Sequence, residues 1–263
     1  MVISFLQKEK ILFEKKTDFN DIKVTRYGST VILYSNFNIR QTQIDLKNPF
    51  FPALEYARNT ILCLLFFPNP EAILILGLGG GSIPMMMQAV YKETDIDIVE
   101  IDPTMFFVAQ EYFHCSPSKR LQVLIDDASM YIEKTKKHYD MIIMDAYFGD
   151  KQPKSLTNLD FLQKLKTRLS PNGLLISNLM TGNRAAYEDM TRKIGFLFPE
   201  VWLLPGDVSS NVLAFACQQS ISKGKLIENS FHMQGIVPFD LNLANLAKRL
   251  EKWVIKDKED DIS

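Results

Sequence analysis

The chain has 263 residues, 46% of them hydrophobic, which suffices for one large domain or for a small domain beside a standard one. Its 30 Lys and Arg balance 31 Asp and Glu, so nucleic acid is not an expected partner, and the three widely spaced cysteines form no metal motif. With no secretion signal at the N-terminus and no apolar run long enough for a membrane span, we expect a cytoplasmic protein without a membrane partner.

The first 52 residues predict a small antiparallel β unit. Three segments rich in β-branched and aromatic residues are separated by turn residues, and they lie at 11–13, 22–26 and 30–34. The sequence KNPFFP at 47–52 interrupts this pattern, and a helix is expected at 53–67, before Pro68. We therefore expect an N-terminal β-strand domain over residues 1–52.

Strands and helices alternate from residue 71 onward. Apolar strands are predicted at 72–76, 97–101, 121–125, 139–144 and 174–178, helices at 82–91, 104–113, 128–136, 158–169 and 185–196, and a turn at 170–173. This alternation predicts an α/β fold with a parallel sheet covered by helices. Strands at 200–204 and 211–216 are close enough to pair only as an antiparallel hairpin, which is typical of class I methyltransferase-like Rossmann cores. We expect this catalytic domain to span 53–250, followed by a charged, frayed tail at 251–263.

A glycine-rich segment after the first of these strands predicts a cofactor site. Its glycines permit a tight turn and close approach of a ligand, and the serine opens a helix whose first amides point at that ligand: Gly77, Gly79, Gly81 and Ser82. Glu100 ends the next strand, where a carboxylate can accept hydrogen bonds from two ribose hydroxyls. The pattern predicts a ribose-bearing cofactor; a plain βα turn beside a surface glutamate is the alternative.

Two features favour S-adenosylmethionine (AdoMet) over a nicotinamide dinucleotide. Ser82 stands where the dinucleotide fingerprint has its third glycine. Asp126, Asp127 and Ala128 follow the third strand, where AdoMet-type enzymes commonly place an acid near the adenine amino group.

Asp145 ends the fourth strand and is the candidate catalytic residue. Ligands bind beyond the carboxyl ends of such strands, so Glu100, Asp127 and Asp145 are expected on one rim. Asp145 is available as a base for an amine or as an anchor for a cation, and capping of the next loop is the alternative. Tyr56 can reach the same rim from the preceding helix, although a buried core tyrosine is equally expected. The histidines show no nucleophile or metal pattern, so no metal is expected.

Together these residues resemble the spermidine synthase family, the aminopropyltransferases, over residues 10–217. The motifs that carry the resemblance lie at 17–24, 77–82, 99–103, 126–128, 139–145, 156–161, 169–173 and 198–201. The resemblance implies a homodimer with a small N-terminal β domain and a class I core. It implies that Glu100 holds ribose, that Asp127 contacts adenine, and that Asp145 and Tyr56 help to deprotonate the acceptor amine. The implied cofactor-binding set also includes Asp102 and Ala128.

The chain departs from the family pattern at the acceptor side. Ser82 and Phe148 stand where the family has aspartates, and the family's Gln-x-Glu segment is here residues 178–180, NLM. A diamine needs several carboxylates to replace its hydration, because an unpaired buried cation is costly. We therefore expect a small-molecule amine or another acceptor, and not plain putrescine.

Four functional hypotheses remain open. The first is a spermidine synthase-like transferase in polyamine biosynthesis that uses AdoMet or decarboxylated AdoMet to alkylate an amine by aminopropyl transfer. The others are ordinary spermidine synthesis with a rearranged diamine site, an AdoMet-dependent methyltransferase, and a non-catalytic nucleoside-binding homologue. Methyl transfer needs mainly positioning, so the missing acids would not hinder it.

Overall fold

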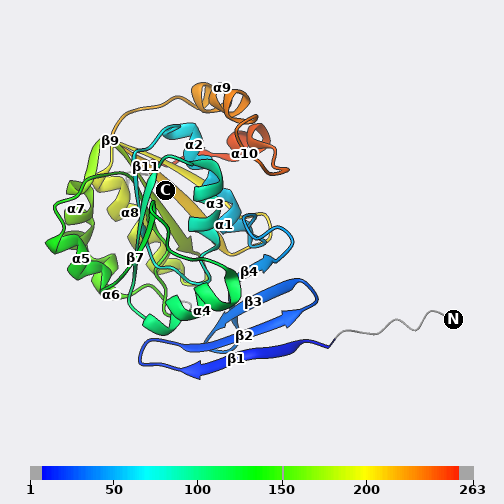
Figure 1. The fold of residues 1–263 in the computed structure, drawn as a ribbon. Coiled ribbons are helices and arrows are strands. Elements are labelled where there is room, and N and C mark those ends of the chain that lie inside the picture. The colour runs from blue at the N-terminus through cyan, green and yellow to red at the C-terminus, as the bar shows by residue number, and fades with distance from the viewer. Residues whose placement is uncertain (1–7, 150, 255–263) are drawn as a thin grey trace, which may run out of the picture.

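The computed structural model describes residues 8–149 and 151–254, and these form two sheets (Figure 1). The smaller sheet is antiparallel and has four strands in chain order: β1 (Lys10–Lys16), β2 (Asp21–Tyr27), β3 (Thr30–Ser35) and β4 (Ile39–Asp45). The first three strands coincide with the predicted segments. The polar sequence of β4, IRQTQID, does not indicate a strand by composition, and pairing with β3 decides its conformation.

The small sheet does not bury a core of its own. Its buried residues, among them Ile22 and Leu33, form one cluster with Val108 and Phe113 of α4 (Pro103–Phe113). Figure 1 shows the sheet lying against this helix. The sheet is therefore held to the larger sheet through α4, which begins directly after the strand that ends at Glu100.

The larger sheet has the order β12-β10-β11-β9-β8-β5-β6-β7. Its strands are β5 (Ala72–Leu76), β6 (Asp95–Glu100), β7 (Leu121–Ile125), β8 (Tyr139–Met144), β9 (Leu169–Met180), β10 (Glu200–Pro205), β11 (Asn211–Cys217) and β12 (Glu251–Lys252). β5 to β9 are parallel, whereas β10 and β11 form an antiparallel hairpin beside β9. The predicted α/β fold, a parallel sheet that ends in an antiparallel hairpin, is confirmed.

Helices cover both faces of this sheet because its strands are apolar on both sides. One face, with Ile73 and Ile75, packs against α1 (Glu55–Asn59), α2 (Cys63–Phe66), α3 (Ser82–Val90), α9 (Lys223–Met233) and α10 (Leu243–Arg249). The other face, with Leu74 and Leu76, packs against α5 (Ala128–Lys134), α7 (Leu159–Thr167) and α8 (Arg184–Leu197), and the short α6 (Lys154–Thr157) lies beside them. The alternation along β5 follows from the two-residue period of a strand.

The helix expected at 53–67 is not continuous, which corrects that prediction. α1 is followed by the 3₁₀ helix η1 (Thr60–Leu62) and then by α2. The hydroxyl of Thr60 donates to the carbonyl of Ala57 at 2.7 Å, and such local bonds together with β-branched side chains weaken a regular α-helix.

Two further differences lie near the end of the chain. Residues 170–173 do not form a separate turn before a strand; they lie within β9 as an interruption of its register with β8. Residues 251–252, expected in a frayed tail, pair with β10 as β12, while 255–263 lie outside the described residues. Within the described part of the chain, every helix is too short or too polar to cross a membrane.

Candidate active site

The carboxyl ends of β5, β6, β7 and β8 meet at one edge of the sheet, and two adjoining cavities open there. The first cavity is lined by the glycine turn, the end of β6, residues 126–128 and the loop after β8. The second cavity lies on the β4 side, between the glycine turn, Tyr56 and the ends of β9 and β11. The cavities meet at the glycine turn and Asp145, because both are lined by Gln41, Gly77, Leu78, Gly79, Asp145 and Tyr147.

Glycine is required at position 77 by both conformation and space. Gly77 has φ +95°, and a Cβ there would lie 2.5 Å from the carbonyl oxygen of Asp145. The turn after β5 can therefore contact the end of β8 only without a side chain. Gly79 also lines both cavities, whereas Gly81 lines neither: its α-carbon faces the buried Cys115 side chain. Gly81 thus packs the turn against Cys115. The prediction that Gly81 lines the cofactor site is wrong.

Glu100 lies at the end of β6 with its carboxylate directed at the glycine turn. Its oxygens accept hydrogen bonds from the backbone N–H of Leu78 and of Asp102, both at 2.9 Å. Burial raises the pKa of Glu100, and these two hydrogen bonds oppose that rise. Because a carboxylate offers about four lone-pair sites, capacity remains for two donors from a ligand in the first cavity.

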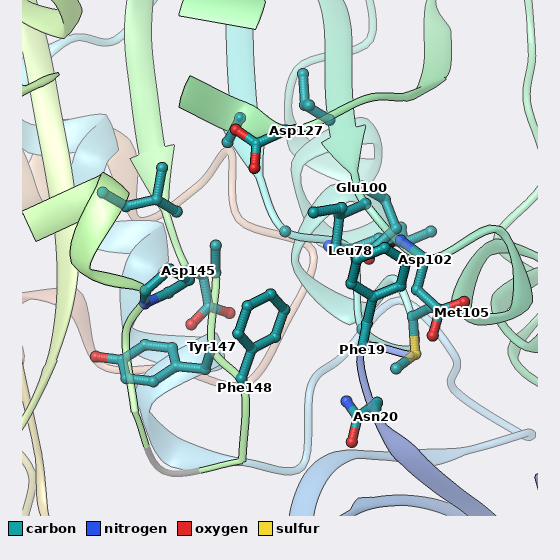
Figure 2. Close-up of a pocket in the computed structure, with 18 of the residues that line it drawn as sticks. Phe19, Asn20, Leu78, Glu100, Asp102, Met105, Asp127, Asp145, Tyr147 and Phe148 are labelled. Carbon is teal, nitrogen blue, oxygen red and sulfur yellow. Dashed lines mark hydrogen bonds between the residues drawn. The ribbon is translucent and has the colours of Figure 1, made fainter. Parts of the chain in front are cut away.

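Asp127 lines the same cavity and caps α5. One oxygen, Oδ1, accepts from the backbone N–H of Ser129 and Met130 and from the Ser129 hydroxyl. Its Oδ2 has no hydrogen-bond partner within the described residues. Ala128 follows it in the cavity wall and is nearly buried. Figure 2 shows Asp127 and Glu100 on the same side of the cavity.

Asp102 also borders the first cavity, but both of its oxygens are engaged by the protein. Oδ1 caps α4 through the N–H of Thr104 at 2.8 Å, and Oδ2 accepts from the hydroxyl of Thr17 at 2.6 Å. The side chain is 2% exposed. Asp102 therefore joins the loop after β1 to the start of α4.

Asp145 is a buried carboxyl at the junction of the cavities. Its Oδ1 accepts from Nδ2 of Asn178 at 2.8 Å, and Oδ1 of Asn178 accepts in turn from Asn211 at 2.9 Å. Burial raises the pKa of Asp145 to about 7, and hydrogen bonds from Asn178 and Tyr56 limit that rise. A carboxyl that exchanges its proton near neutral pH suits general-base chemistry.

Tyr56 lines the second cavity together with Asp145, so it reaches the predicted rim. Its hydroxyl donates to the carbonyl of Gln41 at 3.3 Å. Burial, and then the neighbouring Asp145, raise the pKa of Tyr56 well above its ordinary value. Tyr56 therefore remains protonated and acts as a hydrogen-bond donor at this junction.

Comparisons with known proteins identify the family. The spermine/spermidine synthase domain matches residues 60–202, which include the glycine turn, Glu100, Asp127 and Asp145. The chain belongs to this family.

Relatives of this spermidine synthase-like chain include two kinds of transferase. The polyamine aminopropyltransferase of Vibrio vulnificus is 40% identical over 141 residues, 52% of this chain and 46% of that protein. The eEF1A lysine and N-terminal methyltransferase of Homo sapiens is 30% identical over 199 residues, 67% of this chain and 28% of that protein. The matched segments thus span less than half of each relative.

A solved structure extends the likeness to three dimensions. Human methyltransferase-like protein 13 in complex with SAH is 26% identical, with a TM-score of 0.64, and the alignment covers 72% of this chain and 95% of that chain. The fold is therefore shared between this spermidine synthase-like chain and a methyltransferase.

For a chain of this family, the second cavity holds few acids. Of the described residues that line it, Asp145 is the single carboxylate and Arg40 the single cation. Ser82 borders this cavity and not the first, which differs from its predicted place beside the cofactor turn. Phe148, at the family's second aspartate, stacks on Phe19 of the β1–β2 loop with ring centroids 6.4 Å apart (Figure 2).

Several cavity residues escape detection from sequence. Arg40 and Gln41 lie on β4, whose pattern gives no strand signal, and Asn211 begins β11 without any motif. Asn178 carries a usable signal, because it is a polar residue near the end of an apolar strand beside β8. The described residues contain no group of three His, Cys, Asp or Glu side chains that could hold a metal.

Proposed function

We propose that this chain binds AdoMet or decarboxylated AdoMet and alkylates an amine acceptor other than putrescine by aminopropyl transfer. The observation that carries the proposal is the pair of cavities that meet at Asp145. In this assignment the first cavity holds the nucleoside, with the free sites of Glu100 on the ribose hydroxyls and Oδ2 of Asp127 toward adenine. The second cavity receives the acceptor beside the methionine-derived tail of the donor.

The residues fit such a donor by their chemistry. A ribose presents two adjacent O–H donors, and Glu100 has two lone-pair sites left after its backbone hydrogen bonds. An adenine amino group is a donor that suits the unpaired oxygen of Asp127. The bound donor supplies an electrophilic carbon on a positively charged sulfur, next to the acceptor.

The protein contributes positioning and proton transfer. The acceptor nitrogen attacks the carbon that joins the aminopropyl chain to sulfur. An N–C bond forms, the C–S bond to that carbon breaks, and the electron pair of the broken bond stays on sulfur. Asp145 takes the proton that the nitrogen loses, and its pKa of about 7 lets it do so near neutrality. Asn178 holds that carboxylate in place through its Nδ2, and Tyr56 lines the same cavity.

The charge of the second cavity argues against plain putrescine. A diamine brings two positive charges, whereas the described lining offers one carboxylate and one guanidinium. Burying a neutral polar group without a hydrogen-bond partner costs roughly 2–7 kcal/mol. Burying an unpaired ammonium costs more than that. The proposal therefore excludes a long polycation from this cavity.

Calorimetry with methylthioadenosine, the nucleoside part shared by both donors, tests the proposal. We expect binding by the wild-type chain and weaker binding by Glu100→Gln. Absence of binding at millimolar ligand rejects the nucleoside assignment.

Methyl transfer is the second candidate, and the relationship to the human methyltransferase and to the SAH-bound structure favours it. In that case the methyl carbon is attacked and S-adenosylhomocysteine leaves, whereas aminopropyl transfer releases methylthioadenosine. Mass spectrometry of the nucleoside product separates the two reactions. Homodimer formation, which the family resemblance implies, stays a prediction that sedimentation tests.

A further inference from the structure

The first residues of β4 run along the second cavity. In the β3–β4 ladder Arg40 pairs with Tyr34 and Thr42 pairs with Leu33, so Gln41 is the extra residue of a β-bulge. Arg40 and Gln41 line the second cavity together with their neighbours Ile39 and Thr42.

Arg40 supplies a positive charge that no polyamine site needs. Its side chain is exposed at the cavity, and it makes no ion pair or hydrogen bond within residues 8–149 and 151–254. A guanidinium is built to bind a carboxylate through two parallel hydrogen bonds. Its place in the cavity therefore favours a ligand with a negative group and disfavours a second ammonium.

Gln41 adds an acceptor without a donor. Its Oε1 is buried and has no hydrogen-bond partner within the described residues. Buried polar atoms are nearly always paired, so a ligand donor is the natural partner for this oxygen. The same stretch of cavity contains the carboxylate of Asp145, a second acceptor for an ammonium.

We propose that the second cavity binds an α-amino acid head group, with its carboxylate on Arg40 and its ammonium facing Gln41 and Asp145. The inference rests on the proposed function, which places the nucleoside in the first cavity. The head group belongs either to the donor, as the methionine end of intact AdoMet, or to the acceptor, as an amino acid. Both sources present the same chemistry to Arg40.

Two ligand pairs that differ only by a carboxylate distinguish the sources. The first pair is AdoMet and decarboxylated AdoMet, measured by calorimetry; the second is ornithine and putrescine, compared as acceptors by kcat/KM. For a donor head group, the wild-type chain binds AdoMet about tenfold more tightly than the decarboxylated form. For an acceptor head group, the two donors bind alike and ornithine is preferred over putrescine by about tenfold.

Arg40→Gln should abolish the preference for the carboxylate-bearing ligand of whichever pair shows one. Arg40→Lys should retain part of that preference. Because Arg40 is exposed, we expect both variants to fold, and Arg26→Gln, an exposed arginine of the same sheet that lines neither cavity, is the matched control. Methylthioadenosine has no carboxylate, so Arg40→Gln leaves its binding unchanged.

The result that overturns the inference is a wild-type chain with neither preference, or a preference that survives Arg40→Gln. Methylthioadenosine separates this outcome from a failure of the proposed function. If it binds while both carboxylate preferences are absent, the nucleoside site stands and the head-group site is rejected. If it does not bind to the wild-type chain, the proposed function itself fails.

Discussion

The two cavities share one wall but differ in charge. Of the described residues, four carboxylates line the first cavity alone: Glu100, Asp102, Asp126 and Asp127. Among the described residues of the second cavity, the shared Asp145 is the one carboxylate, and Arg40 lines the same cavity. The first cavity thus keeps the acidic rim of the family pattern, whereas the second has lost it. The contrast shows that one edge of a transferase sheet can carry an acidic cavity beside a cavity with few carboxylates.

The carboxylates of the first cavity are also supported differently. Glu100 is held by the backbone N–H groups of Leu78 and Asp102, which a side-chain substitution at those positions leaves in place. The carboxyl of Asp145 accepts from the side chain of Asn178. The carboxylate of Glu100 is therefore fixed by the backbone, whereas that of Asp145 is fixed by a replaceable side chain.

Removing the carboxylate of Asp145, which both cavities share, should have the largest effect on catalysis. Asp145→Asn keeps the size of the side chain, but an amide cannot take up the proton that the attacking nitrogen loses. We therefore expect kcat to fall by about 10²–10⁴-fold. Binding of methylthioadenosine should stay within about twofold of wild type, because Asp145 does not hold the nucleoside in this assignment. Single-turnover kinetics and calorimetry measure the two quantities. Unchanged turnover would favour the non-catalytic nucleoside-binding alternative.

A substitution in the first cavity should weaken nucleoside binding more than it slows the transfer step. Glu100→Gln loses the charge that strengthens two hydrogen bonds to ribose, and we expect methylthioadenosine to bind about tenfold to hundredfold more weakly. Glu111→Gln, on the exposed side of α4, is a matched control that should bind normally. Equal affinities for the two variants would show that Glu100 does not face the ligand.

The same contrast explains what the sequence could predict. Glu100, Asp127 and Asp145 follow apolar parallel strands, and such strands end at one edge, so their convergence was predictable from the order of elements alone. The parallel sheet and the closing hairpin were predictable for the same reason. The family resemblance added the roles, which stay predictions.

The second cavity was harder to predict because tertiary contacts create it. Arg40 and Gln41 line it through the pairing of β4 with β3, and a single sequence does not reveal that register. Gly81 has the right motif but turns toward Cys115, since its motif position does not say which side of the turn faces the ligand. The break of the 53–67 helix depends on a hydroxyl contact that periodicity ignores.

A smaller change should move the pH dependence of the junction. The proposed base must be ionised, so kcat/KM should rise with pH through about 7, the pKa to which burial raises Asp145. The hydrogen bond from Asn178 lowers that pKa, and Asn178→Ala should therefore shift the rising limb to higher pH. At pH 7 we expect a loss of up to about tenfold, recovered in part at pH 9, because one pKa unit corresponds to a factor of ten. If the rising part of the pH profile does not shift in Asn178→Ala, a group other than Asp145 controls it.

The smallest expected effect concerns the bond that ties the small sheet to the first cavity. Thr17→Val removes the hydroxyl that donates to Oδ2 of Asp102 and accepts from the backbone N–H groups of Phe19 and Asn20. We expect the free energy of unfolding to fall by about 1–3 kcal/mol, the usual cost of losing a few such hydrogen bonds, as measured by urea denaturation. Thr17→Ser keeps the hydroxyl and should lie close to wild type. Because Asp102 also caps α4 and donates its N–H to Glu100, the valine variant should weaken methylthioadenosine binding slightly and leave the ornithine-to-putrescine ratio unchanged. A change in that ratio would mean that the two cavities are coupled through the small sheet.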